Sequence, residues 1–265
     1  MPAGGAAVAA GLGRAFGGAL IFGLPMLMTN ELWELGVSMD RLRLALLLVL
    51  GVPLLVGVSH RIGFEPSFGW REDLRNAAIA LGVGLVAGTL ILATFNLLGD
   101  DLSLDALVGR VAVQTVPAAL GALLARSQFG SQPREEREAF SGYFGTLFMM
   151  LVGALFLGLN VAPTEEMVQI AWTMTPWHAL GLVALTVATM HAFVYGHGTG
   201  DGQGPWWSLL LRFTLVGYAL ALAISLYVLW TFGRVDGVGG APLLMATLVL
   251  AFPAALGAAA ARLIL

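Results

Sequence analysis

The chain is a succession of apolar runs of about twenty residues, with its charged residues collected in the short gaps between them. A helix of that length spans the hydrocarbon core of a bilayer. Helices of soluble proteins instead carry polar residues along one face throughout. Composition agrees, since 58% of the 265 residues are hydrophobic and only 11% are charged. We therefore expect an all-helical integral membrane protein surrounded by a lipid bilayer.

Polar, Gly and Pro residues divide the apolar sequence into eight predicted spans. The period-two alternation of barrel strands is absent, and a backbone in lipid must satisfy its own hydrogen bonds, so the spans are predicted to be helices. They cover residues 14–37, 42–59, 75–98, 106–126, 141–172, 176–195, 207–232 and 241–264.

The arginines predict the orientation of these spans, because cytoplasmic segments carry an excess of positive charge. Most of them lie near the two termini and in or beside the loops around 60–75 and 127–138, and the loop around 196–206 is predicted on the same side. We therefore expect a multi-pass protein of the inner (plasma) membrane with both termini in the cytoplasm. The arginines on the predicted outer side are Arg41, Arg43, Arg110 and Arg234.

The two halves of the sequence match when the chain is shifted by 135 residues. Identities at one fixed shift, with no gap, indicate an internal repeat. The matched pairs include Gly18 with Gly153, Thr29 with Thr164, Glu31 with Glu166 and Met39 with Met174.

A second repeated string supports the same duplication. After a one-residue slip, PAALGA at 117–122 recurs at 253–258. Each string holds a glycine that is followed four residues later by an alanine, Gly121 with Ala125 and Gly257 with Ala261. This spacing of small residues predicts close packing of the fourth and eighth spans. We expect tandem four-helix repeats at residues 1–132 and 133–265. Each holds an even number of spans, so the repeats are predicted to be parallel and related by a pseudo-two-fold axis along the membrane normal.

Two segments carry a resemblance to a known family. GALIFGLPMLMTNELWELG, at residues 18–36, and GALFLGLNVAPTEEM, at residues 153–167, resemble the signature segments of a bacterial family of integral membrane proteins, domain of unknown function 2391. The likeness extends over nearly the whole chain. It implies a membrane fold and location, and supplies no site residues.

The leading site candidate is the duplicated Thr-x-Glu sequence near the outer ends of the first and fifth spans. An ionisable group at membrane depth costs about 2.5–3.5 kcal/mol, so its presence in both copies asks for a reason. Carboxylates facing each other across the pseudo-two-fold axis can share a proton or coordinate a hard cation. The alternative is that they are solvated helix ends. The candidate ion-binding residues are Thr29, Glu31, Glu34, Asn160, Thr164, Glu165 and Glu166.

Composition argues against several other kinds of site. Net charge is −3 and no basic patch is present, which excludes nucleic acid as a partner. The absence of Cys removes thiolate metal sites and iron–sulfur clusters, and the absence of Lys removes Schiff-base cofactors. We therefore expect no cofactor. The sequence is compatible with a homo-oligomer.

These observations favour a transport protein with a cation or proton pathway at the interface between the repeats. The second hypothesis is a non-catalytic sensor or assembly subunit, whose PAALGA faces and cytoplasmic loops bind other proteins.

A third hypothesis is an intramembrane hydrolase. Glu165-Glu166 followed by Phe193-x-x-x-His197 is similar to two motifs of the eight-span proteases that process prenylated proteins. The pattern departs from that family at Ile170, where the family has Arg, and in lacking a later His. Because the glutamates and His197 are predicted at opposite membrane faces, about 30 Å apart, we do not expect an enzyme.

Overall fold

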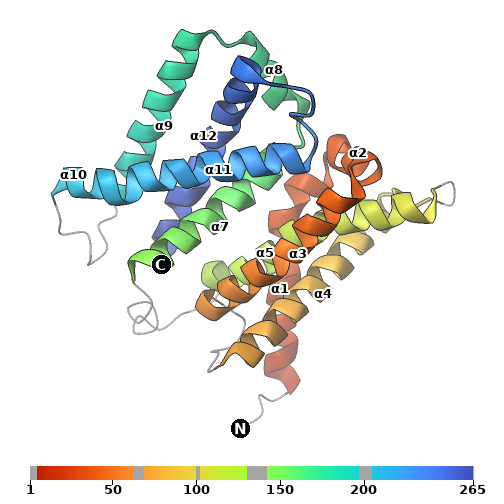
Figure 1. The fold of residues 1–265 in the computed structure, drawn as a ribbon. Helices are drawn as coiled ribbons and strands as arrows, with labels where there is room; N and C mark the ends of the chain where they lie inside the picture. The colour runs from red at the N-terminus through yellow and green to blue at the C-terminus, as the bar shows by residue number, and fades with distance from the viewer. Residues whose placement is uncertain (1–4, 63–68, 100–101, 130–141, 197–204, 265) are drawn as a thin grey trace. The chain divides into compact units, whose positions relative to one another are not determined.

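The computed structural model describes residues 5–62, 69–99, 102–129, 142–196 and 205–264 (Figure 1). Every regular element in these ranges is a helix, and eight of them are long and apolar enough to cross a membrane. The prediction of an all-helical membrane protein with eight spans is therefore confirmed. The chain separates into two compact units, Met1–Gln132 and Pro133–Leu265.

The first unit is organised around its last helix. Its long helices are α1 (Gly5–Leu27), α3 (Arg41–Ile62), α4 (Trp70–Thr94) and α5 (Leu104–Phe129), and the short α2 (Asn30–Ser38) connects α1 to α3. Helix α5 packs against each of the other four. Its membrane-spanning window is 72% buried, against 28–33% for α1, α3 and α4. The core of this unit therefore surrounds α5.

The second unit has the same order of elements. It comprises α7 (Tyr143–Val161), α8 (Glu165–Thr173), α9 (Pro176–Gly196), a helix made of α10 (Trp206–Leu209), the π-helical η1 (Leu210–Leu215) and α11 (Val216–Thr231), and finally α12 (Gly240–Ile264). Helix α12 packs against α7, α8, α9 and α11 and is again the most buried, at 67% of its spanning window.

In each unit the first and last long helices cross at glycines. A Cβ atom added to Gly121 of α5 would lie 2.8 Å from the carbonyl oxygen of Gly18 in α1. In the second unit, a Cβ on Gly257 of α12 would clash with the carbonyl oxygen of Gly153 in α7, and the reverse also holds. The close packing predicted for the PAALGA strings is confirmed. The partners of the strings are the GAL sequences at residues 18–20 and 153–155, a pairing that was not predicted.

The same crossings bury the PAALGA faces inside their own units. Ala118, Ala119 and Ala122 of α5 are at most 1% exposed, and Ala254, Ala255 and Ala258 of α12 are fully buried. The expectation that these faces bind other proteins is therefore wrong, because α1 and α7 already cover them.

The first and fifth predicted spans are shorter than expected. The sequence analysis continued them to residues 37 and 172, but α1 ends at Leu27 and α7 at Val161, and a separate nine-residue helix follows each. In the second unit Pro163 explains the break, because proline has no N–H to continue the helical ladder. Thr29 and Thr164 adopt extended conformations at the breaks and begin α2 and α8.

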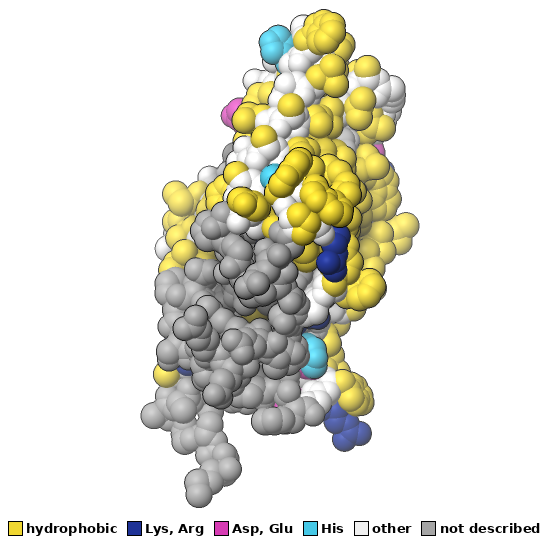
Figure 2. All heavy atoms as spheres, turned by 90° about the vertical axis from the view of Figure 1, so that its left-hand side faces the viewer, with side chains coloured by type: hydrophobic (Ala, Val, Ile, Leu, Met, Phe, Trp, Pro, Cys, Tyr) yellow, Lys and Arg dark blue, Asp and Glu magenta, His cyan; other side chains and the backbone are white. Residues whose placement is uncertain are grey.

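Much of the outer surface of the helices is apolar. Figure 2 shows hydrophobic side chains over much of the described part of the face that carries α9. On this helix Trp177, Leu180 and Leu185 are 55–81% exposed. Exposure of such apolar side chains to water is unfavourable, whereas contact with lipid tails is not.

We predict that Gly121→Val and Gly257→Val each lower the melting temperature of the detergent-purified protein. The added side chains meet backbone atoms, which cannot rotate away, so a cost of about 1–3 kcal/mol is expected. Gly82→Val in α4 and Gly181→Val in α9 are matched controls, because no atom lies within 4 Å of a Cβ added there. Equal losses in crossing and control variants would contradict this account of the crossings.

Candidate ion-binding site

The first part of the candidate site is the turn between α1 and α2. Thr29 precedes the first residue of α2, and its backbone N–H donates to the carbonyl oxygen of Met26 at 3.1 Å. Its side-chain hydroxyl donates to the same oxygen at 2.8 Å. Since the hydroxyl proton is used in this bond, the lone pairs of Oγ1 remain as acceptors. Thr29 can therefore offer an oxygen to a cation or a proton donor.

The second part, the turn between α7 and α8, has the same local geometry. The backbone N–H and the hydroxyl of Thr164 both donate to the carbonyl oxygen of Val161, at 3.1 Å and 2.8 Å. Asn160, in the last turn of α7, donates its Nδ2 to the carbonyl oxygen of Phe156 at 2.7 Å. The Oδ1 atom of Asn160 is therefore the end of the amide that can accept a ligand.

The four candidate carboxylates lie on the short helices that follow these turns. Glu31 is half-buried in the first turn of α2, and Glu34 is exposed and accepts a hydrogen bond from Asn30 Nδ2 at 2.8 Å. Glu165 and Glu166 are exposed in the first turn of α8. Negative charge in a first helical turn is favoured by the helix dipole, so Glu31, Glu165 and Glu166 stabilise the starts of these short helices.

These acids lie beyond the membrane-spanning windows, contrary to the prediction. The windows end at Met26 and Val161, and the short helices begin after them. Each short helix buries one side against the central helix of its unit, α2 on α5 and α8 on α12. The acids are therefore not part of the eight long apolar helices. They are better described as carboxylates at the mouth of a bundle.

Arginines stabilise the short helices in a way that the sequence analysis missed. Arg41 donates to the carbonyl oxygens of Gly36 and Val37, at 2.8 Å and 3.1 Å, and pairs with Asp105 at 2.6 Å. In the second unit Arg234 donates to the carbonyl oxygen of Pro163. For Arg41 the available signal was its position just after a predicted helix end, where the last carbonyls lack partners. The contact of Arg234 with the α7–α8 turn has no such local signal.

Within each unit the candidate residues are neighbours in sequence, so the local geometry follows from the turns alone. The meeting of Glu31 with Glu166 stays a prediction. Among the described residues, no group of three His, Asp or Glu could hold a metal ion. Single carboxylates beside hydroxyl and amide oxygens instead suit a proton or a weakly held cation.

The hydrolase hypothesis gains no support from the second unit. Glu165 and Glu166 lie at the start of α8, before Pro176 begins α9. Helix α9 then extends for 21 residues, or about 30 Å at 1.5 Å per residue, before the chain reaches position 197. His197 itself lies outside the described residues.

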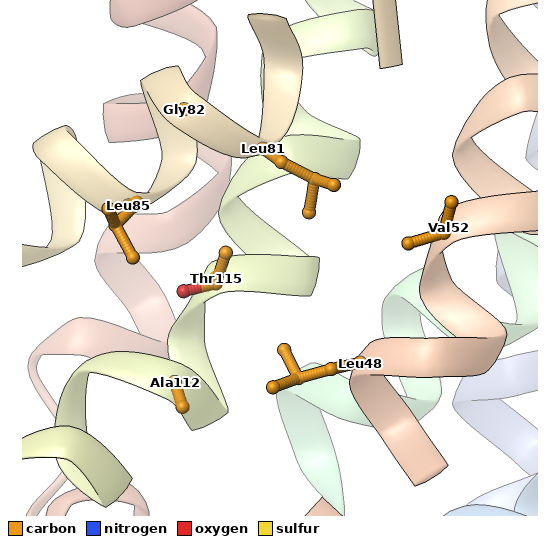
Figure 3. Close-up of a pocket in the computed structure, with 7 residues that line it drawn as sticks. All are labelled: Leu48, Val52, Leu81, Gly82, Leu85, Ala112 and Thr115. Carbon is orange, nitrogen blue, oxygen red and sulfur yellow. The ribbon is translucent and has the colours of Figure 1, made fainter. Parts of the chain in front are cut away.

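A pocket in the first unit is apolar rather than ion-binding. It measures about 340 Å³. Its lining comes from three helices, α3, α4 and α5, and consists of Leu48, Val52, Leu81, Gly82, Leu85, Ala112 and Thr115 (Figure 3). Thr115 is the one polar side chain in its lining, and its hydroxyl donates to the carbonyl oxygen of Val111 at 2.9 Å. Such a pocket suits a lipid acyl chain.

Buried polar groups elsewhere were only partly anticipated. His191, predicted inside a span, lies half-buried with Nδ1 3.0 Å from the hydroxyl of Thr214, a fully buried residue of η1. His60 contacts the buried carboxylate of Asp73, which the sequence analysis did not single out. The sequence feature that could have revealed Asp73 is its spacing from Asn76, one helical turn away, on a helix face that continues with small residues.

Comparison with known proteins gives one match. The family model described as "Putative integral membrane protein (DUF2391)" matches residues 11–265. Neither the curated proteins nor the solved structures contain a match.

We predict that Glu166→Cys reacts with a water-soluble maleimide in native membranes, whereas Met167→Cys does not. Glu166 is exposed and Met167 is 2% exposed, and the protein has no cysteine of its own, so each introduced thiol reports one position. Maleimides react with the thiolate, which forms only where water reaches the side chain. Asn30→Cys and Leu32→Cys form the matching pair on α2. Failure of Glu166→Cys to react would place this carboxylate against lipid or protein.

Proposed function

The chain belongs to the DUF2391 family of integral membrane proteins, and on this premise we propose that it is a membrane transport protein for a small cation or a proton. The two units act as tandem parallel repeats in this proposal, and the pathway runs along the interface between them. Parallel repeats with a substrate site between the halves occur in known transporter folds. This analogy concerns only the place of the pathway. The support for the transport proposal comes from the residues of the two turns.

The observation that carries the proposal is the recurrence of one turn in both units. Thr29 and Thr164 use the same two hydrogen bonds to the third preceding carbonyl, and a glutamate stands two residues later in each case. A solvated helix end needs no such repetition. In our proposal Glu31 and Glu166 bind the ion where it enters, and the threonines with Asn160 contribute neutral oxygens.

The two remaining carboxylates extend this acidic entrance. Glu34 and Glu165 are exposed on the same short helices. Acidic side chains at the mouth of a pathway raise the local concentration of cations and their rate of entry. We also propose an inner-membrane location with both termini in the cytoplasm. The two acidic turns, which are residues 29–34 and 164–166, then lie on the outer side of the membrane.

We predict that purified protein in liposomes carries H⁺, Na⁺ or K⁺, each assayed separately, and that a Glu31→Gln, Glu166→Gln double variant loses most of this flux. Glutamine keeps the size and shape of glutamate, but it removes the charge that holds the ion and replaces one acceptor oxygen with an N–H donor group. Flux is measured with an internal fluorescent indicator for each cation, against empty liposomes.

The matched control is an Asp40→Asn, Asp236→Asn double variant. It removes the same charge from two other exposed acids, one in each unit. Asparagine at position 40 can still accept the hydrogen bond that Asp40 Oδ1 takes from the Arg43 backbone N–H. Equal flux in both double variants, or no flux above empty liposomes in the native protein, would overturn the proposal.

A further inference from the structure

A second group of polar side chains lies where α3 ends and α4 begins, away from the acids of α2. Asp73, in the first turn of α4, is 3% exposed, and Asn76, one turn later, is 1% exposed. Ser59, in the last turn of α3, is also 1% exposed. The two helices pack against each other, so all three side chains face the interior of the first unit.

One contact fixes the relative level of these residues. His60 Nδ1 lies 2.9 Å from Asp73 Oδ2, while the imidazole itself is 52% exposed. Position 60 of α3 therefore stands beside position 73 of α4. Ser59 and Asn76 lie within one helical turn of this contact, so the three buried side chains occupy one level of the bundle.

Each of the three buried residues has an unused polar atom. Asp73 Oδ1, Asn76 Nδ2 and Ser59 Oγ have no hydrogen-bond partner among the residues that the structure describes. A buried polar atom without a partner destabilises the folded protein, and a charged one does so more strongly. The helix dipole explains why an acid is favoured in a first turn, but not why its oxygen is buried and unbonded.

The donor set indicates the chemistry of the missing partner. One carboxylate oxygen and one hydroxyl oxygen are hard ligands, and the Asn76 amide presents its oxygen after a half-turn about χ2. Divalent ions at protein sites draw on several carboxylates or on substrate phosphates. Among the three buried side chains Asp73 is the one carboxylate, and the residues that the structure describes hold no group of three His, Asp or Glu. A single negative charge matches a monovalent cation.

We propose that Ser59, Asp73 and Asn76 bind a sodium ion inside the first unit, at the end of the α3–α4 pair. The carboxylate supplies the charge, and the hydroxyl and the amide supply neutral oxygens. His60 is a positioning residue, because its contact with Oδ2 turns Oδ1 toward the interior. The site goes beyond the transport proposal, since it involves none of the residues of the acidic turns.

The second unit does not repeat this site. At a shift of 135 residues, the positions of His60 and Asp73 hold Tyr195 and Ser208. A duplicated structural device would appear in both copies, whereas a single acid in one copy suggests a role specific to that unit. The sodium site therefore breaks the repetition that the acidic turns preserve.

The test is equilibrium binding of radioactive Na⁺ to the purified full-length protein in detergent, with choline chloride holding the ionic strength constant. The native protein is expected to bind Na⁺ saturably. Asp73→Asn removes the charge, and its affinity is expected to fall by more than about tenfold. Glu72→Gln is the matched control, because it removes the same charge one residue away and should bind as the native protein does.

Ser59→Ala keeps the proposal falsifiable if Asp73→Asn fails to fold. Removing a hydroxyl that serves no ligand would leave Na⁺ affinity unchanged, whereas loss of an ion ligand weakens it. The measurement is repeated in the Glu31→Gln, Glu166→Gln background, where the acids at 31 and 166 no longer hold a cation. Saturable Na⁺ binding that remains there and is lost on Asp73→Asn belongs to this site, so failure of the flux prediction and failure of this one are distinguishable. Absence of saturable binding in the native protein, as expected if only water contacts these side chains, would overturn the proposal. Binding that survives Asp73→Asn in the Glu31→Gln, Glu166→Gln background would overturn it as well.

Discussion

The close crossing of the first and last long helix is the contact on which each unit depends. Lipid tails are as apolar as the side chains of the bundle, so burying apolar surface gives little driving force for helix association in a membrane. Van der Waals contact between backbones has to supply it. Gly18 with Gly121, and Gly153 with Gly257, allow that contact because neither partner carries a Cβ. The central position of α5 and α12 follows from it.

The short helices use the same surface of the central helices. A second pair of glycines, Gly36 of α2 and Gly109 of α5, brings these two helices close together. A Cβ atom on either glycine would clash with backbone atoms of the other helix. In the second unit Met167 and Ala171 bury the inner side of α8, and α8 packs on α12. Both units thus hold their acidic turns rigidly at the end of a well-packed helix, although they achieve this with different residues.

Polar groups in this protein are concentrated at helix ends, which is where a bilayer tolerates them. Arg41, Arg110 and Arg234 each donate to a backbone carbonyl that a helix end or loop leaves without a helical partner. Asp73 and Asn76 are almost fully buried residues, and Asp73 combines a carboxylate with an oxygen that has no partner among the described residues. In a chain with few charges, we regard a buried carboxylate oxygen without a hydrogen-bond partner as the clearest indication of a ligand.

The sequence by itself determined the class of the protein, its eight spans and the positions of its recurring motifs, because the length of an apolar run and the spacing of small residues are local properties. Only the tertiary structure decided which motifs touch, that Thr29 and Thr164 stand at a break between two helices instead of lying within one, and that Asp73 is buried beside His60. These outcomes depend on contacts between residues far apart in the chain and on backbone breaks that hydropathy does not register. A polar residue near a span end reads the same whether it faces water or the core, and packing makes the difference.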